Sequence, residues 1–215
     1  EYRDYHRYID WRWIMMELAT LTAGAVLLWR YRLPFLVMPI AVTLWYMSMD
    51  LTPFLFGDED YDWLLRKWVS VYSGLLIMLL GFWVDIRTRH TRDYAFWLYL
   101  FGLMAFWGGL SSMSSDSEWN KFIYLCINLG LLLLGAILAR RAFAVFAAFG
   151  ICAYIGHLAY DVFEDSLLFP FVMTLAGFAI IYLGILWQRH EQALTRRLRA
   201  LLPQALRELI EHRAS

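Results

Sequence analysis

Charged residues are scarce in this sequence. Only 18% of its 215 residues are Asp, Glu, Lys or Arg, whereas 61% are hydrophobic. Soluble domains carry about 25% charged residues, so this composition excludes an ordinary water-soluble globular protein. Lysine is the rarest charged residue, with 2 lysines against 17 arginines. This preference for arginine points to a GC-rich bacterial genome.

Cysteine, lysine and histidine are too few for several known kinds of site. Cys126 and Cys152 both fall within apolar runs, so we expect core residues and no disulfide. The last apolar run contains no lysine, which argues against a retinal Schiff base. His157 is the single histidine in any run, whereas membrane hydrolases of the ceramidase type use several around zinc. We therefore predict a non-enzymatic protein with no catalytic residue, no cofactor and no nucleic-acid partner, and the identity of any metal stays open.

Long apolar runs recur along the whole chain. About 20 residues cross a hydrocarbon core of about 30 Å, and seven runs are of this order. They are continuous rather than alternating, which favours helices over a membrane β-barrel. The expected spans are Trp13 to Trp29, Leu33 to Phe56, Trp68 to Val84, Tyr94 to Met113, Trp119 to Ala139, Ala142 to Tyr160, and Leu167 to Trp187. The sequence therefore predicts an all-α bundle of seven transmembrane helices, with sequence neighbours packed antiparallel.

Small residues and prolines predict details of this packing. Glycines or alanines recur at helical spacing, which predicts close helix contacts where lipid supplies no hydrophobic drive for association. The pairs are Gly74 with Gly81, Gly177 with Gly184, and Ala19 with Ala23. Pro39 falls inside the second run, where we expect it to kink the helix.

The basic residues predict the orientation. Thirteen of the 19 basic residues follow the first, third, fifth and seventh runs, and the loops on the other side are acidic. Basic residues near helix ends are retained in the cytoplasm. We therefore expect the amino terminus outside, the carboxyl terminus in the cytoplasm, and a location in the bacterial inner membrane.

The end of the chain differs from the rest. Residues 1–188 form the predicted transmembrane domain, and residues 189–215 form a cytoplasmic tail with leucines on one helical face and arginines largely on others. This pattern predicts an amphipathic helix that binds anionic lipid headgroups, or alternatively a protein partner or a further copy in a homo- or hetero-oligomer.

Polar residues inside the runs are the candidates for a functional site. Glu17, Asp50, Asn128 and His157 lie in the outer halves of four different runs, and Asp161 follows His157 by one helical turn. The spacing of Gly150, Tyr154, His157, Asp161 and Glu164 forms one continuous seam, which we expect to face other helices.

The charges of these residues do not balance. The runs contain two carboxylates, Glu17 and Asp50, and no Arg. Besides Lys121, near the start of the fifth run, His157 is the one group able to become a cation. An isolated ionised carboxylate is costly in apolar surroundings, so these acids must be protonated, paired, hydrated or neutralised by a bound ion.

Two functions fit this imbalance. In the first, Glu17, Asp50, Asn128, His157 and Asp161 contribute to a periplasm-facing site that binds a proton, a cation or a small solute for transport or sensing. His157 would then switch protonation near neutral pH. In the second, these groups form interhelical hydrogen bonds in a structural or assembly subunit without a ligand site.

Three stretches carry a resemblance to a known group of proteins. They are LPFLVMPIAVTLWYMSMDLTPFLFG, DYAFWLYLFGLMAFWGGL and SLLFPFVMTLAGFAIIYLGILWQRHE. These stretches resemble uncharacterised multi-pass membrane proteins of proteobacteria that carry a domain of unknown function. The resemblance implies a membrane protein, and it brings no activity and no site residue with it.

Overall fold

The computed structural model describes residues 2–56, 63–87, 93–113, 117–138 and 140–158, and nine positions between 170 and 185. Side chains are described from residue 12 to 50 in the first stretch and from residue 64 in the second. Regular structure in these residues is entirely helical, which confirms the all-α prediction for this part of the chain. The elements are α1 (Tyr2–Tyr31), the 3-10 helix η1 (Pro34–Leu36), α2 (Val37–Phe56), α3 (Trp63–Arg87), α4 (Ala95–Ser111), α5 (Glu118–Leu138) and α6 (Arg141–His157).

The helices follow the first six predicted runs, with two corrections. α1 begins at Tyr2, because the polar residues before the apolar run are also helical. The second run does not begin as one helix, since Leu33 is extended and a 3-10 turn starts at Pro34. The seventh run, from Leu167 to Trp187, lies mostly outside the described residues.

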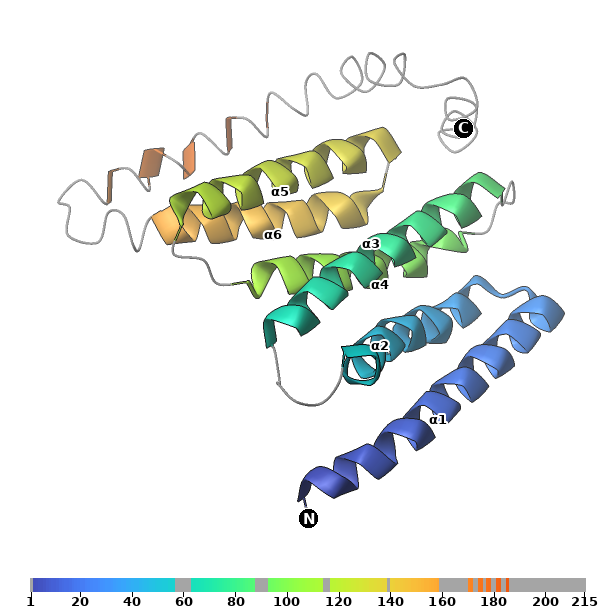
Figure 1. Cartoon of the computed structure of the whole chain (residues 1–215). Helices are drawn as coiled ribbons and strands as arrows, with labels where there is room; N and C mark the ends of the chain where they lie inside the picture. Colours follow the sequence, from blue (N-terminus) through green and yellow to red (C-terminus); the bar gives the residue numbers. More distant parts are fainter. Residues whose placement is uncertain are drawn as a thin grey trace. The chain divides into compact units, whose positions relative to one another are not determined.

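The proline that interrupts the hydrogen bonding of α2 is Pro53 and not Pro39. Pro39 is the third residue of α2, where a backbone N–H has no partner within the helix, so the expected interior kink at Pro39 is wrong. Pro53 lies in the interior of the helix instead, and Figure 1 shows the last turns of α2 running in a different direction from the rest. Pro53 removes the donor that the Met49 carbonyl would otherwise accept.

The chain divides into two compact units, residues 1–114 and 115–215. In the first unit, α2 packs against α1, α3 and α4. Its apolar core contains Val37, Ala41, Ile77 and Leu98. At one end of this unit, Arg32 takes a left-handed conformation with φ 50°, and its carbonyl accepts a hydrogen bond of 2.5 Å from the Tyr94 hydroxyl. This bond ties the α1–η1 turn to the start of α4.

Glycines bring α3 and α4 into close contact. The backbones of Gly74 and Gly102 face each other, and Gly81 lies against Leu98 and Tyr99, so the two helices run antiparallel. The predicted close contacts at Gly74 and Gly81 are therefore confirmed. Nearby, the buried Ser70 hydroxyl donates to the carbonyl of Ala105 at 2.8 Å.

The other predicted small-residue pairs do not mark contacts among the described residues. Ala19 and Ala23 are exposed, because the face of α1 that meets α2 carries Gly24 against Ile40. A side chain at Gly177 would meet no described atom within 4 Å, and Gly184 lies outside the described residues.

The second unit contains the antiparallel pair α5 and α6. Near the short connection between them, Gly135 lies against Phe143 and Ala144. Further along, the side chain of Asn128 on α5 occupies the space above Gly150 on α6.

Two described helices are long and apolar enough to cross a membrane, by length and composition alone. They are the segments Leu64–Arg87 of α3 and Glu118–Leu138 of α5. Shorter apolar helical segments cover Pro34–Asp50, Ala95–Ser111 and Arg141–His157.

The seam between α3 and α4 predicts a difference between two glycines of α4. A Cβ at Gly102 would lie 2.9 Å from the Met78 nitrogen and 3.0 Å from the Gly74 carbonyl, whereas one at Gly108 would meet nothing within 4 Å. We expect Gly102→Ala to lower the free energy of unfolding by about 1–3 kcal/mol and Gly108→Ala to leave it unchanged or raise it by up to about 1 kcal/mol. Thermal unfolding of the purified variants measures both effects, and equal stabilities would contradict the seam.

Candidate functional site

Glu17 lies on the one face of α1 that is covered. Five positions spaced three and four residues apart are buried or half-buried, and the other residues described between Arg12 and Tyr31 are exposed. The covered positions are Ile14, Glu17, Leu21, Gly24 and Leu28. Glu17 is 8% exposed, so its carboxyl group lies in the contact between α1 and α2 and not on the free surface of α1.

Asp50 of α2 meets Glu17 across this contact. Asp50 lies on the helix that packs against this face of α1, and its carboxyl group is close enough to that of Glu17 for the two charges to repel each other. The second oxygen of Glu17, Oε2, is buried and has no hydrogen-bond partner among the described residues. The two groups can hydrogen-bond to each other only when one of them carries a proton, because an ionised carboxylate has no hydrogen to donate. The structure therefore brings together two of the predicted site residues as an acidic pair.

The pair lies close to a disrupted part of the α2 backbone. Asp50 immediately follows Met49, whose carbonyl loses its usual helical donor at Pro53. Other polar groups on this part of α1 are already bonded within the helix, as the Thr20 hydroxyl donates to the Met16 carbonyl at 2.8 Å.

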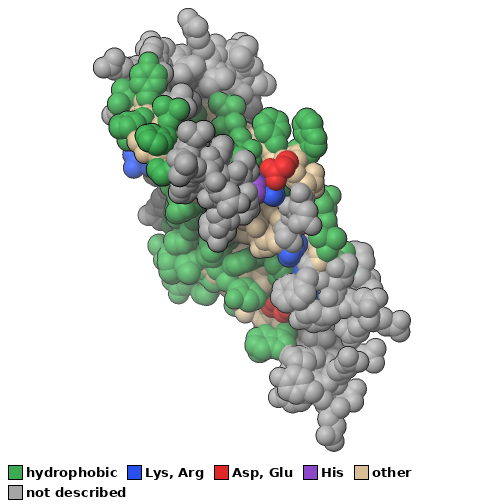
Figure 2. All heavy atoms as spheres, turned by 90° about the vertical axis from the view of Figure 1, so that its left-hand side faces the viewer, with side chains coloured by type: hydrophobic (Ala, Val, Ile, Leu, Met, Phe, Trp, Pro, Cys, Tyr) green, Lys and Arg blue, Asp and Glu red, His purple; other side chains and the backbone are tan. Residues whose placement is uncertain are grey.

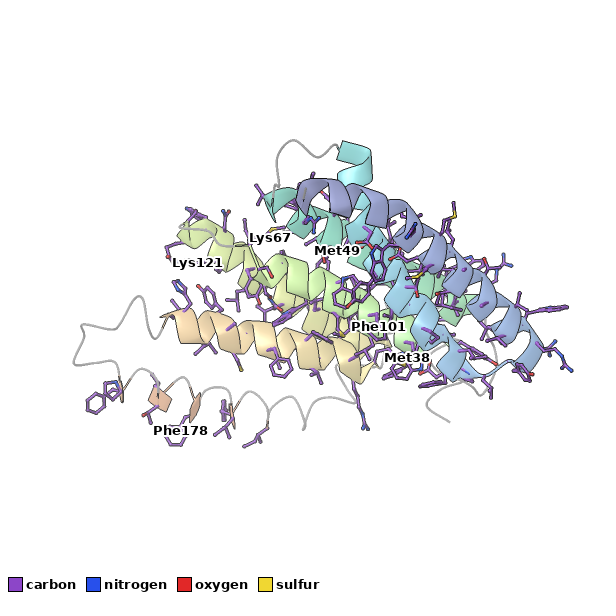
Figure 3. The ribbon with its side chains drawn as sticks, turned by 90° about the horizontal axis from the view of Figure 1, so that it is seen from below. Met38, Met49, Lys67, Phe101, Lys121 and Phe178 are labelled. Atoms are coloured by element: carbon purple, nitrogen blue, oxygen red, sulfur yellow. The ribbon has the colours of Figure 1, made fainter. Side chains whose placement is uncertain are left out.

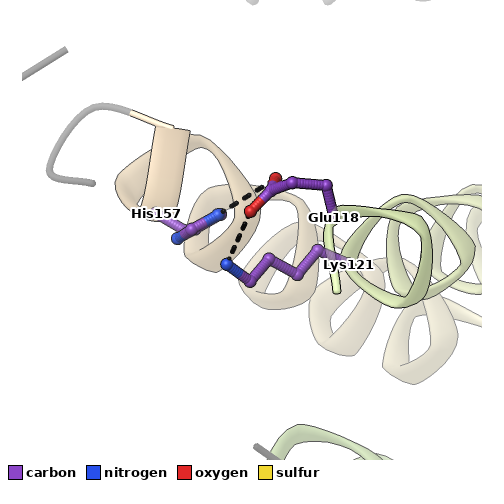
Figure 4. A network of polar contacts seen from close by, with 3 residues as sticks. All are labelled: Glu118, Lys121 and His157. Carbon is purple, nitrogen blue, oxygen red and sulfur yellow. Dashed lines mark hydrogen bonds and ion pairs between the residues drawn. The ribbon is translucent and has the colours of Figure 1, made fainter. Parts of the chain in front are cut away.

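His157 lies at the end of α6 and contacts α5. Its Nε2 atom is 3.6 Å from Oε2 of Glu118, and Nζ of Lys121 is 2.8 Å from Oε1 of the same carboxylate (Figure 4). His157 is mostly buried, whereas Glu118 is 63% exposed. The sequence pattern did not indicate Glu118 as the partner of His157, because the pairing depends on the alignment of two helices.

Asn128 is the most deeply buried of the predicted site residues. It is 0% exposed, its Nδ2 atom donates to the Tyr124 carbonyl at 2.8 Å, and its Oδ1 atom has no hydrogen-bond partner among the described residues. Its side chain rests on Gly150, so the absence of a side chain there makes room for the amide. The position indicates a packing role between α5 and α6.

The predicted residues thus fall into separate groups. Glu17 and Asp50 meet in the first unit, while Asn128 and His157 lie in the second. Within the second unit, Gly150 and His157 both face α5, but two helical turns, or about 10 Å, separate them along α6. Asp161 and Glu164, the rest of the predicted seam, lie outside the described residues.

One buried acid was missed by sequence reasoning. Asp85 of α3 is 9% exposed and accepts a long hydrogen bond of 3.4 Å from the buried Tyr99 hydroxyl of α4. It lies one residue beyond the predicted third run, so it was not counted among the intramembrane carboxylates. Its spacing of four residues from Gly81, on the face that packs against α4, was the available signal.

Neither a metal-binding cluster nor a similarity to known proteins assigns a function to the described residues. Among the described residues, no group of three or more His, Cys, Asp or Glu side chains is placed to hold a metal ion. No protein-family model, curated protein or solved structure matches this chain.

The packing role of Asn128 predicts the outcome of two substitutions. Asn128→Leu removes a buried acceptor without a partner and keeps a similar shape, so we expect the free energy of unfolding to change by less than about 1.5 kcal/mol. Asn128→Asp buries a charge at the same place, and we expect a loss of about 3 kcal/mol or more. Denaturation of both variants measures these changes, and a Leu variant as unstable as the Asp variant would refute the packing role.

Proposed function

We propose that this chain is a multi-pass membrane protein with a periplasm-facing acidic site for a proton or cation, used in transport or sensing. The proposal includes the seven-span arrangement, the outer amino terminus and the bacterial inner membrane inferred from the sequence. The observation that carries the functional part is the contact between Glu17 and Asp50 on two apolar helices.

The outward face of α3 supports the location in a membrane. Its exposed side chains from Leu64 to Ile86 are all Leu, Trp, Tyr or Ile, and Leu76 is 66% exposed. At about 1.5 Å per residue this apolar face is about 33 Å long, close to the thickness of a hydrocarbon core. Exposed apolar side chains cover much of the described surface in Figure 2. An apolar surface of this extent needs an apolar medium or partner to cover it.

Residues at the helix ends support the proposed depth. Trp13, Trp29, Trp68 and Trp119 are exposed near the ends of predicted spans, and Trp119 is 76% exposed, as expected of side chains in the headgroup region. The two lysines, Lys67 and Lys121, each lie in the first turns of a helix, α3 and α5 (Figure 3). Both helices are proposed to start at the outer face.

The acidic pair supports ligand binding because no basic side chain among the covered, described positions of α1 or within α2 balances its charge. Carboxyl groups within membrane helices are costly and mark proton or ion sites in many transport proteins. A proton or cation bound at the pair would remove this cost.

Three further parts of the proposal rest on the sequence alone. They are the kinship with uncharacterised proteobacterial membrane proteins, the binding of the 189–215 tail to anionic lipid or to a protein, and a homo- or hetero-oligomeric state. Residues 189–215 lie outside the described part of the chain.

A structural or assembly subunit is the second candidate. It is favoured by Ser70 and Asn128, whose polar groups serve contacts between helices in both units. In such a protein the acidic pair would also only join helices.

The acidic pair predicts a pH-dependent stability. A proton shared by Glu17 and Asp50 stabilises the fold at low pH, and this stabilisation is lost as the pH rises and both groups ionise. Loss of one proton changes the free energy of unfolding by about 1.4 kcal/mol per pH unit, so we expect the apparent Tm to fall by about 3 °C per pH unit across the titration. Glu17→Gln and Asp50→Asn should remove this dependence while the protein stays folded. Thermal unfolding of the full chain in detergent at several pH values measures the effect.

The control is Glu118→Gln, which changes an exposed acid in the other unit and should keep the dependence. If Glu17→Gln and Asp50→Asn instead unfold the protein or release a copurifying partner while the pH profile of the wild type is flat, the structural subunit is the better function.

The orientation predicts which end of α4 is accessible from outside. Ser112 and Asp93 are both exposed and lie just beyond opposite ends of α4. In a chain with Cys126→Ala and Cys152→Ala, we expect a membrane-impermeant maleimide to label Ser112→Cys in intact cells and Asp93→Cys only after lysis. The reverse pattern would invert the topology, and labelling of both in intact cells would refute a crossing by α4.

A further inference from the structure

α1 is held in the first unit by a single narrow contact. Its covered positions form one stripe that packs mainly against α2, and the rest of its described surface is exposed. Figure 3 shows side chains projecting from α1 on the side away from α2. Glu17 occupies the stripe near one end, and Gly24 occupies its middle, where a Cβ would lie 2.8 Å from Cγ1 of Ile40.

The two ends of this contact differ in chemistry. Toward the carboxyl end of α1 the contact is apolar, and Leu28 packs against the core of the unit. The turn that follows is fixed by the Tyr94 hydroxyl on the Arg32 carbonyl. At the other end the covered stripe carries Glu17 between Ile14 and Leu21. This acid is more than nine-tenths buried, faces Asp50, and has an oxygen without a partner among the described residues. Whatever occupies the acidic pair therefore acts on only one end of α1.

A proton fits the acidic pair better than a metal ion does. Calcium takes six to eight oxygen ligands and magnesium demands six. The described part of the site offers two carboxyl groups, and no third acidic side chain or histidine described in the structure joins them. A single proton between two carboxyl groups needs no further ligand and converts repulsion into a charge-assisted hydrogen bond.

We propose that the ligand of this site is one proton shared by Glu17 and Asp50, and that its release detaches the amino-terminal end of α1 from α2. The inference rests on the acidic site of the proposed function and adds the identity of the ligand and its effect on the helix. Two ionised carboxylates in contact repel each other, so the docked position of α1 is favoured at low pH and weakened at high pH.

The charged and titratable groups nearest to the pair along the surrounding helices are arginine, lysine and tyrosine. α1 contributes the exposed Arg12, and α2 contributes the Tyr46 hydroxyl one turn before Asp50. Arg66 and Lys67 lie in the first turns of α3, which packs against α2. Arginine, lysine and tyrosine do not ordinarily titrate between about pH 5 and about pH 9. His6 does, but it lies eleven residues, or about 16 Å, from Glu17 along α1, and it is retained in the control variants.

Distances between spin labels on α1 and α3 test the inference. Cys126→Ala and Cys152→Ala provide the background in the full chain, reconstituted in lipid nanodiscs. Labels at Met16→Cys and Tyr72→Cys report on the amino-terminal end of α1, and labels at Trp29→Cys and Ile86→Cys report on its other end, since all four side chains are exposed. Pulsed electron paramagnetic resonance then gives both distances from about pH 5 to about pH 9.

We expect the first label pair to show one distance at low pH and a second, longer distance in at least about a tenth of the molecules at high pH. The second label pair should keep one distance throughout. In the Glu17→Gln, Asp50→Asn double variant, which retains His6, the first label pair should show the short distance at every pH. A pH-independent distance in the wild type, or an unchanged pH response in the double variant, would overturn the inference.

Two further comparisons complete the test. Adding salts at high pH distinguishes a proton from a cation as the ligand, and comparing the thermal stability with the distances distinguishes this inference from the proposed function. If sodium or calcium chloride at high pH restores the short distance where potassium chloride does not, the ligand is a cation and the proton is excluded. If the thermal stability follows the pH as expected but the distances do not, the acidic site stands and the detachment of α1 is wrong. If neither responds to pH, the proton site and the detachment of α1 are both wrong.

Discussion

Close approach of helix backbones is the constraint on which the described structure depends. If the exposed apolar side chains face lipid, as proposed, these helices gain little from hydrophobic burial against one another, and their contacts must come from close packing and from polar bonds. Gly74 and Gly102 supply this approach between α3 and α4, and Gly135 and Gly150 supply it between α5 and α6. At such short range a polar side chain on the contacting face can reach the neighbouring helix.

The buried polar groups follow from this geometry. Each lies four or seven residues from a glycine on the same helix, which places both on one face. The pairs are Glu17 with Gly24, Ser70 with Gly74, Asp85 with Gly81, Asn128 with Gly135, and His157 with Gly150. Most of these groups find a donor or acceptor on the adjacent helix or their own backbone, as Ser70 does on Ala105. Glu17 differs because the group it faces is another acid, Asp50.

Much of the helical framework could be predicted from the sequence, because long apolar runs allow few alternatives. Six runs correspond to α1 to α6, and the contacts at Gly74 and Gly81 follow from their spacing. The start of α2 was harder to predict, because a proline fixes its own backbone angle both at the start of a helix and at a bend within one. Pro39 and Pro53 differ only in their distance from the helix start.

The polar partners could not be predicted in the same way. Glu17 meets Asp50, and His157 meets Glu118, only because antiparallel helices align at one particular register. That register is set by the packing of many apolar side chains and by short turns, and no local pattern records it. Asp85 was missed for a related reason. It lies one residue beyond the predicted apolar run, so it was left out of the carboxyl groups expected inside the helices, although it is buried.

The described helices pack chiefly against their neighbours in the chain, as α1 does with α2, α3 with α4, and α5 with α6. Such a topology has a low contact order, so few distant segments must find each other before native contacts form. Each hairpin can assemble soon after its second helix leaves the ribosome, and synthesis delivers residues slowly enough for local pairing to precede the next helix. Exposure of unpaired apolar surface during biogenesis is thereby kept short.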